Sequence, residues 1–208
     1  MKNNENQTPY MQSLKTRILE TAMKEFVEKG VKVVRMDDIA KSLGISKRTL
    51  YQIYDGKEEL LYEGLRQYKI RRREKVEEEM KTSDTVMDII LYVYRLNVEE
   101  FRQISSDFLT EITHYPSVQV LFSEDREQSY ERFIGFLRRG VDEGMFKDDV
   151  DLELISVMFS AIGSYITSNK LYLTYEMNKL FKDLIFVSLR GFCTQEGLKH
   201  LERIEKEM

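Results

Sequence analysis

A short run of polar and basic side chains near the N-terminus has the chemistry of a surface that reads DNA bases. Lys47 and Arg48 carry cationic donors that can bond guanine O6 and N7, and the amide of Gln52 can pair with adenine. The methyl group of Thr49 can touch a thymine methyl, and the hydroxyl of Tyr51 can reach a phosphate. On a helix these side chains share one exposed face, so the run predicts a recognition element for the major groove of double-stranded DNA.

The segment 36–54 has the spacing that a helix-turn-helix requires. Ala40 supplies the small side chain that lets two helices cross closely, and Gly44 permits the left-handed backbone of the turn. Ser46 can cap the second helix, and Ile45 and Leu50 can lock that helix onto the first. The alternative is a structural helical hairpin whose basic face is only solvated.

Two further helices flank this segment. Apolar residues recur at the spacing of one helical face from Leu14 onward, and that helix ends at Gly30. After the recognition segment, Asp55 or Gly56 can cap a long fourth helix that begins near Lys57. The first part of the chain is therefore expected to fold as three helices followed by a long connecting helix.

The run ILETAMKEFVEKGVKVVRMDDIAKSLGISKRTLYQIYDGKEELLYEGL resembles the DNA-binding domain of the tetracycline-repressor (TetR) family of bacterial regulators. In that family a first helix ending in Phe-x-x-x-Gly precedes the helix-turn-helix, and the recognition helix reads Gly-hydrophobic-Ser-x-x-Thr-Leu-Tyr. The residues that match these two patterns are Phe26, Gly30, Gly44, Ile45, Ser46, Thr49, Leu50 and Tyr51. A Gly-x-Phe-x-x-Asp-x-Asp run, formed by Gly144, Phe146, Asp149 and Asp151, is similar to one that often precedes the dimerisation helices of the family.

The resemblance implies further DNA contacts and also marks departures from the family pattern. Lys57, at the start of the fourth helix, is expected to touch phosphate, where the positive end of the helix adds to its charge. Arg35 stands where Thr is common and is expected to replace a hydroxyl–phosphate contact with a charged one. Tyr54 replaces the usual Phe, and an Asp-Gly pair at 55–56 replaces a Pro-Ser cap. The expected DNA-binding residues are Arg35, Ser46, Lys47, Arg48, Thr49, Tyr51, Gln52 and Lys57.

Helical patterns continue through the rest of the chain. They predict helices with apolar positions from Val86 to Phe101 and from Phe108 to Thr113, and a helix that spans Val118 to Arg139. Asp149 or Asp151 can cap the next helix, whose apolar positions run from Leu154 to Tyr165, and the last long apolar pattern covers 180–192. Because the last two patterns carry more apolar surface than a small domain can cover, we expect them to form a homodimer interface, with Phe181 and Ile185 as interface positions.

Charge and composition limit the possible functions. Residues 1–75 hold 17 Lys and Arg against 11 Asp and Glu, a net charge of +6, whereas the remainder holds 15 against 25, a net charge of −10. A basic head suits phosphate, and an acidic body is repelled by it. One cysteine and two distant histidines provide no metal motif, and no catalytic motif is present, so we expect no cofactor, no metal and no enzymatic activity. With no signal-peptide pattern and no apolar run long enough to span a membrane, the chain is expected to be cytoplasmic, with no membrane partner.

The sequence thus predicts an all-α protein with two domains: a tail and helix-turn-helix domain over 1–56, and a helical effector-binding and dimerisation domain over 57–208. The expected function is that of a repressor that binds a palindromic operator as a homodimer and is released by a small, mainly apolar effector. No pocket residue is assigned, and Asn97, Thr110, His114 and Ser160 are the polar positions to test first. Two alternatives remain: an activator or effector-independent regulator, and a helical ligand carrier with a vestigial DNA-binding head.

Overall fold

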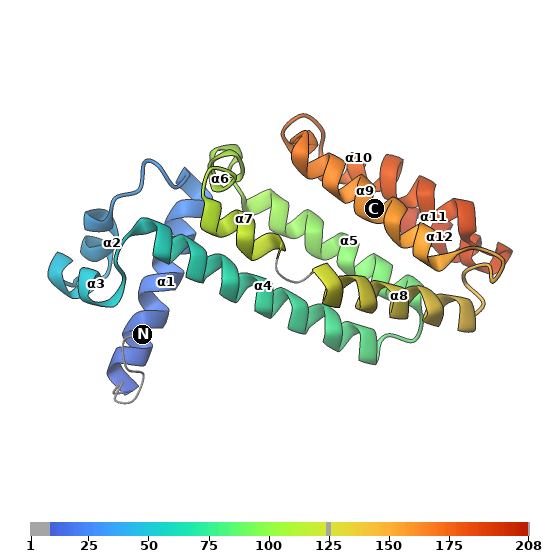
Figure 1. Ribbon diagram of the computed structural model, residues 1–208, viewed down its shortest axis with the longest axis horizontal. Helices are drawn as coiled ribbons and strands as arrows, with labels where there is room; N and C mark the ends of the chain where they lie inside the picture. Colours follow the sequence, from blue (N-terminus) through green and yellow to red (C-terminus); the bar gives the residue numbers. More distant parts are fainter. Residues whose placement is uncertain (1–8, 124–125, 208) are drawn as a thin grey trace. The chain divides into compact units, whose positions relative to one another are not determined.

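The structure, a computed structural model, describes residues 9–123 and 126–207 (Figure 1). Within these ranges the chain is helical and forms no strand, and the only β-type pairing there is an isolated antiparallel bridge between Phe146 and Cys193. The expected all-α class is confirmed. The polar tail over 1–8 lies outside the described residues, and the first helix begins at Pro9, five residues earlier than Leu14.

The chain divides into two compact units. The first comprises Met1–Arg72 and Gln103–Glu124, and the second comprises Arg73–Arg102 and Asp125–Met208. Both α4 (Lys57–Thr82) and α5 (Val86–Gln103) contribute residues to each unit. The unit that carries the helix-turn-helix therefore extends beyond residue 56, and the division at 56–57 stays a prediction.

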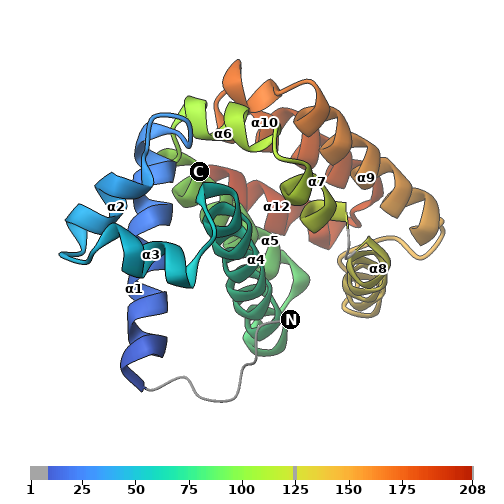
Figure 2. The ribbon, with the colours of Figure 1, turned by 60° about the vertical axis from the view of Figure 1, so that its left-hand side comes forward.

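The first unit packs its helices around one apolar core. Beside the start of α4 it contains α1 (Pro9–Lys29), α2 (Met36–Ser42), α3 (Lys47–Ile53), α6 (Ser106–Ile112) and α7 (Pro116–Ser123). Figure 2 shows α2 beside α1, and α3 packs against α2. The buried side chains that these helices contribute include Ile18, Phe26, Ile39, Leu50, Leu60, Phe108 and Val118.

Gly30 lets α6 approach the end of α1. Its φ of +86° ends the helix in the left-handed region, and a Cβ there would lie 3.1 Å from Asp107 Cβ. The Ser105 N–H donates to Val27 O at 2.9 Å, and the Lys32 N–H donates to Glu111 Oε2 at 2.8 Å. Ser105 and Glu111, which follow their partners by about 80 positions in the sequence, thereby hold the loop that leads into the helix-turn-helix.

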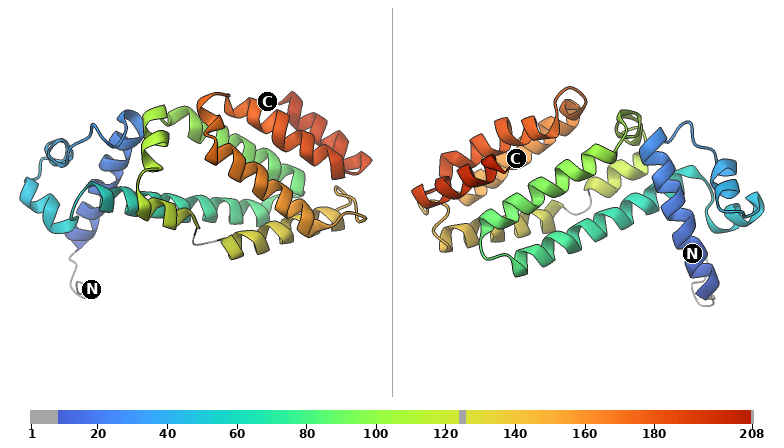
Figure 3. Two further views of the ribbon diagram at one scale, coloured as in Figure 1. Left: turned by 45° about the horizontal axis from the view of Figure 1, so that its top comes forward. Right: turned by 180° about the vertical axis from the view of Figure 1, so that it is seen from behind.

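The helices of the second unit lie alongside one another (Figure 3). With parts of α4 and α5 it contains α8 (Arg126–Asp142), α9 (Leu152–Ser168), α10 (Met177–Leu180), α11 (Val187–Phe192) and α12 (Gln195–Lys206). A short 3-10 turn covers Leu171–Leu173, and a π-helical segment, Phe181–Phe186, joins α10 to α11. Aromatic rings fill much of the core, and the centroids of Phe146 and Phe192 lie 4.9 Å apart.

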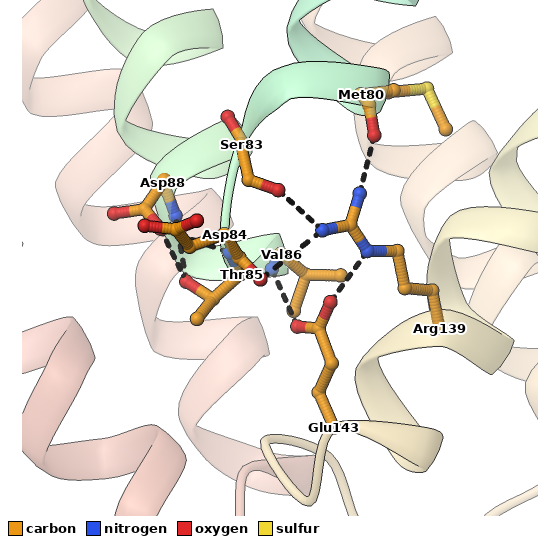
Figure 4. Close-up of polar contacts among 8 residues, drawn as sticks. All are labelled: Met80, Ser83, Asp84, Thr85, Val86, Asp88, Arg139 and Glu143. Carbon is orange, nitrogen blue, oxygen red and sulfur yellow. Dashed lines mark hydrogen bonds and ion pairs between the residues drawn. The ribbon is translucent and has the colours of Figure 1, made fainter.

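A polar joint fixes the α4–α5 turn to α8 (Figure 4). The Arg139 guanidinium donates to the carbonyl oxygens of Met80 and Ser83, the latter at 2.6 Å, and so satisfies acceptors left open at the end of α4. The Glu143 carboxylate accepts from Arg139 Nε and from the N–H of Val86 at 2.7 Å, at the start of α5. Arg139 on α8 and Glu143, the first residue after that helix, therefore form a pair that serves both the end of α4 and the start of α5.

Three features of the helical pattern differ from expectation. The single helix predicted over Val118–Arg139 is two helices, α7 and α8, and residues 124–125 between them lie outside the described residues. The apolar residues of α7 pack in the first unit and those of α8 pack in the second, so one continuous pattern serves two cores. The pattern over 180–192 includes a π-helical segment, and the sequence interpretation missed α12 altogether.

Side-chain caps begin α9 and α12. Asp151 caps α9, because its Oδ1 accepts from the N–H groups of Glu153 and Leu154. Thr194 caps α12 by accepting from the Gly197 N–H at 3.1 Å. Among the residues described, no helix combines the length and apolar character needed to cross a membrane.

Candidate nucleic-acid interface

The turn between α2 and α3 follows from two small residues. Gly44 adopts a φ of +66°, and its N–H donates to Lys41 O at 3.1 Å while the Ile45 N–H donates to Ala40 O at 3.0 Å. Ala40 itself is buried, which allows α3 to lie close to α2. These two positions therefore do in the structure what the sequence predicted of them.

α3 is fixed at its first turn and through its inner face. Ser46 Oγ accepts from the Thr49 N–H at 3.0 Å, and the two hydroxyl oxygens of Ser46 and Thr49 lie 2.8 Å apart. Leu50 is fully buried in the core of the first unit, and Ile45 packs against that core. Because the cap and Leu50 fix both the start and the rotation of α3, the remaining face of the helix must point outward.

The outward face of α3 carries the predicted polar side chains. Lys47, Arg48, Tyr51 and Gln52 are all exposed, whereas Thr49 is half-buried and its hydroxyl contacts Ser46. Lys47 Nζ lies 2.8 Å from Asp37 Oδ1 and 5.9 Å from the centre of the Tyr51 ring. The hydrogen bond and charge of Asp37 raise the pKa of Lys47, so this side chain stays cationic near neutral pH.

Lys57, which is predicted to contact phosphate, also forms hydrogen bonds within the protein. Its Nζ donates to Val31 O at 2.7 Å and to Lys32 O at 3.0 Å. Burial lowers the pKa of Lys57, and attraction to Glu111 opposes that effect. Since an ammonium has three N–H donors, one remains available for a phosphate, and that contact stays a prediction.

The three departures from the family pattern have local explanations. Arg35 occupies the N-cap position of α2, where its N–H donates to Asp38 Oδ2 at 3.3 Å and its side chain is exposed. Tyr54 is buried at the end of α3, and burial raises the pKa of Tyr54 to about 12, so its hydroxyl is neutral. Asp55 and Gly56 lie just before α4, and the Asp55 N–H donates to Glu59 Oε2 in the first turn of that helix.

Sequence interpretation missed two acidic residues of this region, Asp37 and Glu111. Asp37 lies ten positions before its partner Lys47, and Glu111 lies 79 positions after Lys32. Neither spacing is a local helical one, so no short-range signal indicates the pairing. The four polar positions proposed for effector testing also divide between the units, with Thr110 and His114 in the first and Asn97 and Ser160 in the second.

The described residues include no group of three or more His, Cys, Asp or Glu side chains placed to hold a metal ion. What the first unit presents is a capped helix, anchored by an apolar residue, whose exposed face carries Lys, Arg, Tyr and Gln. This arrangement is that of a helix-turn-helix, a DNA-binding motif whose second helix enters the major groove.

Comparisons with known proteins narrow the class. Residues 18–63 match the family "Bacterial regulatory proteins, tetR family". The HTH-type transcriptional regulator YezE of Bacillus subtilis is 25% identical over 187 residues, which cover 83% of this chain and 92% of that protein. The HTH-type transcriptional repressor KstR2 of Rhodococcus jostii is 27% identical over 146 residues, 67% of this chain and 71% of that protein.

Solved structures agree in fold. A protein from Saccharomonospora viridis, named as a transcriptional regulator and solved in complex with choline, aligns with a TM-score of 0.70 at 21% identity, covering 88% of this chain and 100% of that chain. A TetR-family regulator from Cytophaga hutchinsonii aligns with a TM-score of 0.68 at 13% identity, covering 91% of this chain and 100% of that one. The chain is accordingly a DNA-binding transcriptional regulator whose residues 18–63 match the DNA-binding domain of the TetR family.

Proposed function

We propose that the protein is a cytoplasmic repressor that binds a palindromic operator as a homodimer and leaves it when a small, mainly apolar effector binds. The observation that carries DNA recognition is the capped α3, with Leu50 buried and Arg48, Tyr51 and Gln52 exposed. In this proposal Arg48 and Lys47 bond guanine edges, Gln52 reads adenine, and Arg35, Tyr51 and Lys57 contact phosphates. The Thr49 methyl contacts thymine, while Ser46 acts as the cap.

The homodimer is supported by an exposed apolar face in the second unit. Leu154, Val157 and Tyr165 recur at helical spacing on α9 and are 66%, 60% and 62% exposed. Val187 on α11 is 60% exposed, and the two helices contact each other through the rings of Phe159 and Phe192, 6.1 Å apart. A continuous stripe of exposed apolar side chains marks an interaction surface, and the same face of a second copy would cover it.

The interface positions first expected from the sequence need correction. Phe181 meets Tyr94 edge-to-face at 5.6 Å between ring centres, and both Phe181 and Ile185 pack against the core of the second unit. A charge at either position would disturb that core, so a monomer obtained that way would say little about the interface. Leu154 and Val187 are the positions that test it.

Repression and effector release are supported by the relatives. Several are named as repressors, among them KstR2 proteins and the negative regulator IcaR of Staphylococcus epidermidis, and the aligned S. viridis structure holds choline. The second unit is rich in aromatic side chains, as an apolar ligand site usually is, although most of these rings pack in its core. We propose that the effector binds in this unit and lowers operator affinity.

Recovery of genomic DNA fragments by the purified protein tests the proposal. Their sequences give the operator, which should contain two related half-sites about 34–36 Å apart, or a multiple of that spacing. On that operator, Arg48→Ala should weaken binding by about 1–3 kcal/mol and relax the preference at one position in each half-site. Arg203→Ala on α12 removes an equal exposed charge from the second unit and should leave binding unchanged. Equal affinities for the two variants would contradict the assignment of α3.

Repression itself is tested by a reporter gene placed behind the recovered operator. Expression of the protein should lower reporter output, and a ligand that raises the melting temperature of the protein should restore it. An increase in output on expression would indicate an activator. Stabilising ligands that leave operator affinity unchanged would refute effector release.

A further inference from the structure

One acidic side chain lies on the DNA-binding surface beside the recognition helix. Asp37, in the first turn of α2, pairs through Oδ1 with Lys47 Nζ at 2.8 Å, at the first residue of α3. The two side chains are 47% and 59% exposed, so water and ions reach both. Such a pair forms and breaks easily, because exposed ion pairs are weak and screened by salt.

The neighbours of Lys47 favour this paired position. Its ammonium lies over the face of the Tyr51 ring, 5.9 Å from the centre, and the same carboxylate bonds it from the side of α2. Arg48, the next residue, is exposed and forms no ion pair with any residue that the structure describes. Of the two α3 cations expected to meet DNA, Lys47 is therefore already paired with a carboxylate of the protein.

We propose that Asp37 sets the strength of DNA binding by competing with DNA for Lys47. The inference rests on the proposed role of α3 in DNA recognition. A phosphate or base edge can bind Lys47 only after the carboxylate has been displaced. Once displaced, Asp37 faces a polyanion and takes up a solvent cation, which offsets part of the cation release that drives binding. Lys47 therefore adds less affinity, and less salt dependence, than an unpaired lysine would.

Substitution of Asp37 should consequently increase DNA affinity through Lys47 in particular. Asp37→Asn keeps the shape of the side chain and removes its charge. The probe is a random-sequence duplex, so the operator need not be known, and fluorescence anisotropy measures binding over a range of salt concentrations. The matched control is Glu28→Gln, which makes the same change in net charge at an exposed position on α1.

We expect Asp37→Asn to bind the random duplex roughly 1.5- to 5-fold more tightly, the range expected from the strength of an exposed ion pair. The slope of log affinity against log salt should become steeper by about 0.9 for each subunit that engages the DNA. In the Lys47→Gln background the same Asp37 substitution should change neither quantity by more than the Glu28→Gln control does. Thermal unfolding of each variant verifies that the helix-turn-helix is intact.

The outcomes separate this inference from the function on which it rests. If Asp37→Asn has the same effect with and without Lys47, the effect is one of net charge only and the inference is wrong. No increase in affinity would also overturn it. If instead neither Lys47→Gln nor Arg48→Ala alters DNA binding, the role of α3 fails first, and the proposed function fails with it.

Discussion

Two glycines on α8 should respond to the same substitution in opposite directions. Gly135 is exposed, and a Cβ added there would meet nothing within 4 Å. A Cβ at Gly140 would lie 2.2 and 2.3 Å from two ring carbons of Phe146, far inside van der Waals contact. That ring is 1% exposed, with the Phe192 ring centre 4.9 Å away, so it has little room to move.

The magnitudes follow from two opposing effects. Alanine is favoured over glycine in a helix by about 1 kcal/mol, so Gly135→Ala should increase the free energy of unfolding by up to about that amount. At Gly140 the same gain is outweighed by overpacking, which costs about 1–3 kcal/mol and should reach the upper end against a rigid ring. We expect a net loss of about 2 kcal/mol. For a chain of this size this means a fall in melting temperature of about 4–8 °C, against a rise of about 2–4 °C for Gly135→Ala.

Thermal unfolding followed by circular dichroism measures both variants. Repeating Gly140→Ala in a Phe146→Leu background tests the cause, because a smaller and more flexible side chain should relieve the overlap and reduce the loss. Shifts of the same sign for Gly135→Ala and Gly140→Ala, or an undiminished loss in the Phe146→Leu background, would refute the reasoning.

Four further predictions concern single residues. Arg139→Gln should lower the free energy of unfolding by about 2 kcal/mol, because it leaves carbonyl groups at the end of α4 without their donor. Urea unfolding with an unchanged m value would measure this loss. An unchanged free energy of unfolding would show that the polar joint contributes nothing to stability. Leu154→Glu should convert the proposed homodimer to folded monomers at micromolar concentration in sedimentation, with the helical spectrum retained; an unchanged dimer would place the interface elsewhere. Lys57→Met should lower the free energy of unfolding by about 1 kcal/mol, since two hydrogen bonds to the α1–α2 loop are lost, and should also weaken DNA binding; an effect on DNA alone would mean that these bonds do not matter. Burial raises the pKa of Cys193 to about 11 from an ordinary 9.0, so the stability that the neutral thiol contributes is present below pH 9 and is lost as the pH rises toward 11. The free energy of unfolding of Cys193→Ala, measured against pH, should therefore decline less over this window than that of the unmodified protein. Identical profiles for the two proteins would contradict the prediction.

Local sequence determined the helix-turn-helix in considerable detail. The helix-turn-helix depends on four residues that are close in sequence, and each acts through its immediate neighbours. They provide a close crossing, a left-handed turn, a cap and an anchor, and are Ala40, Gly44, Ser46 and Leu50. The outward face of α3 then follows from the helical period. The same reasoning identified Asp151 as the cap of α9. α12 could also have been found, because Thr194 precedes apolar residues at helical spacing, Leu198 and Leu201.

Tertiary structure alone decided which partners these side chains meet. The carboxylate of Asp37 reaches Lys47 only because α2 and α3 cross, and Glu111 reaches the Lys32 N–H only because α6 packs over Gly30. Likewise, the apolar pattern over 118–139 does not say that its two halves serve separate cores. Helical period, caps and turns depend on residues a few positions apart, so they can be read along the chain. Contacts between helices depend on crossing angles and side-chain rotamers, which are fixed only when the whole core packs.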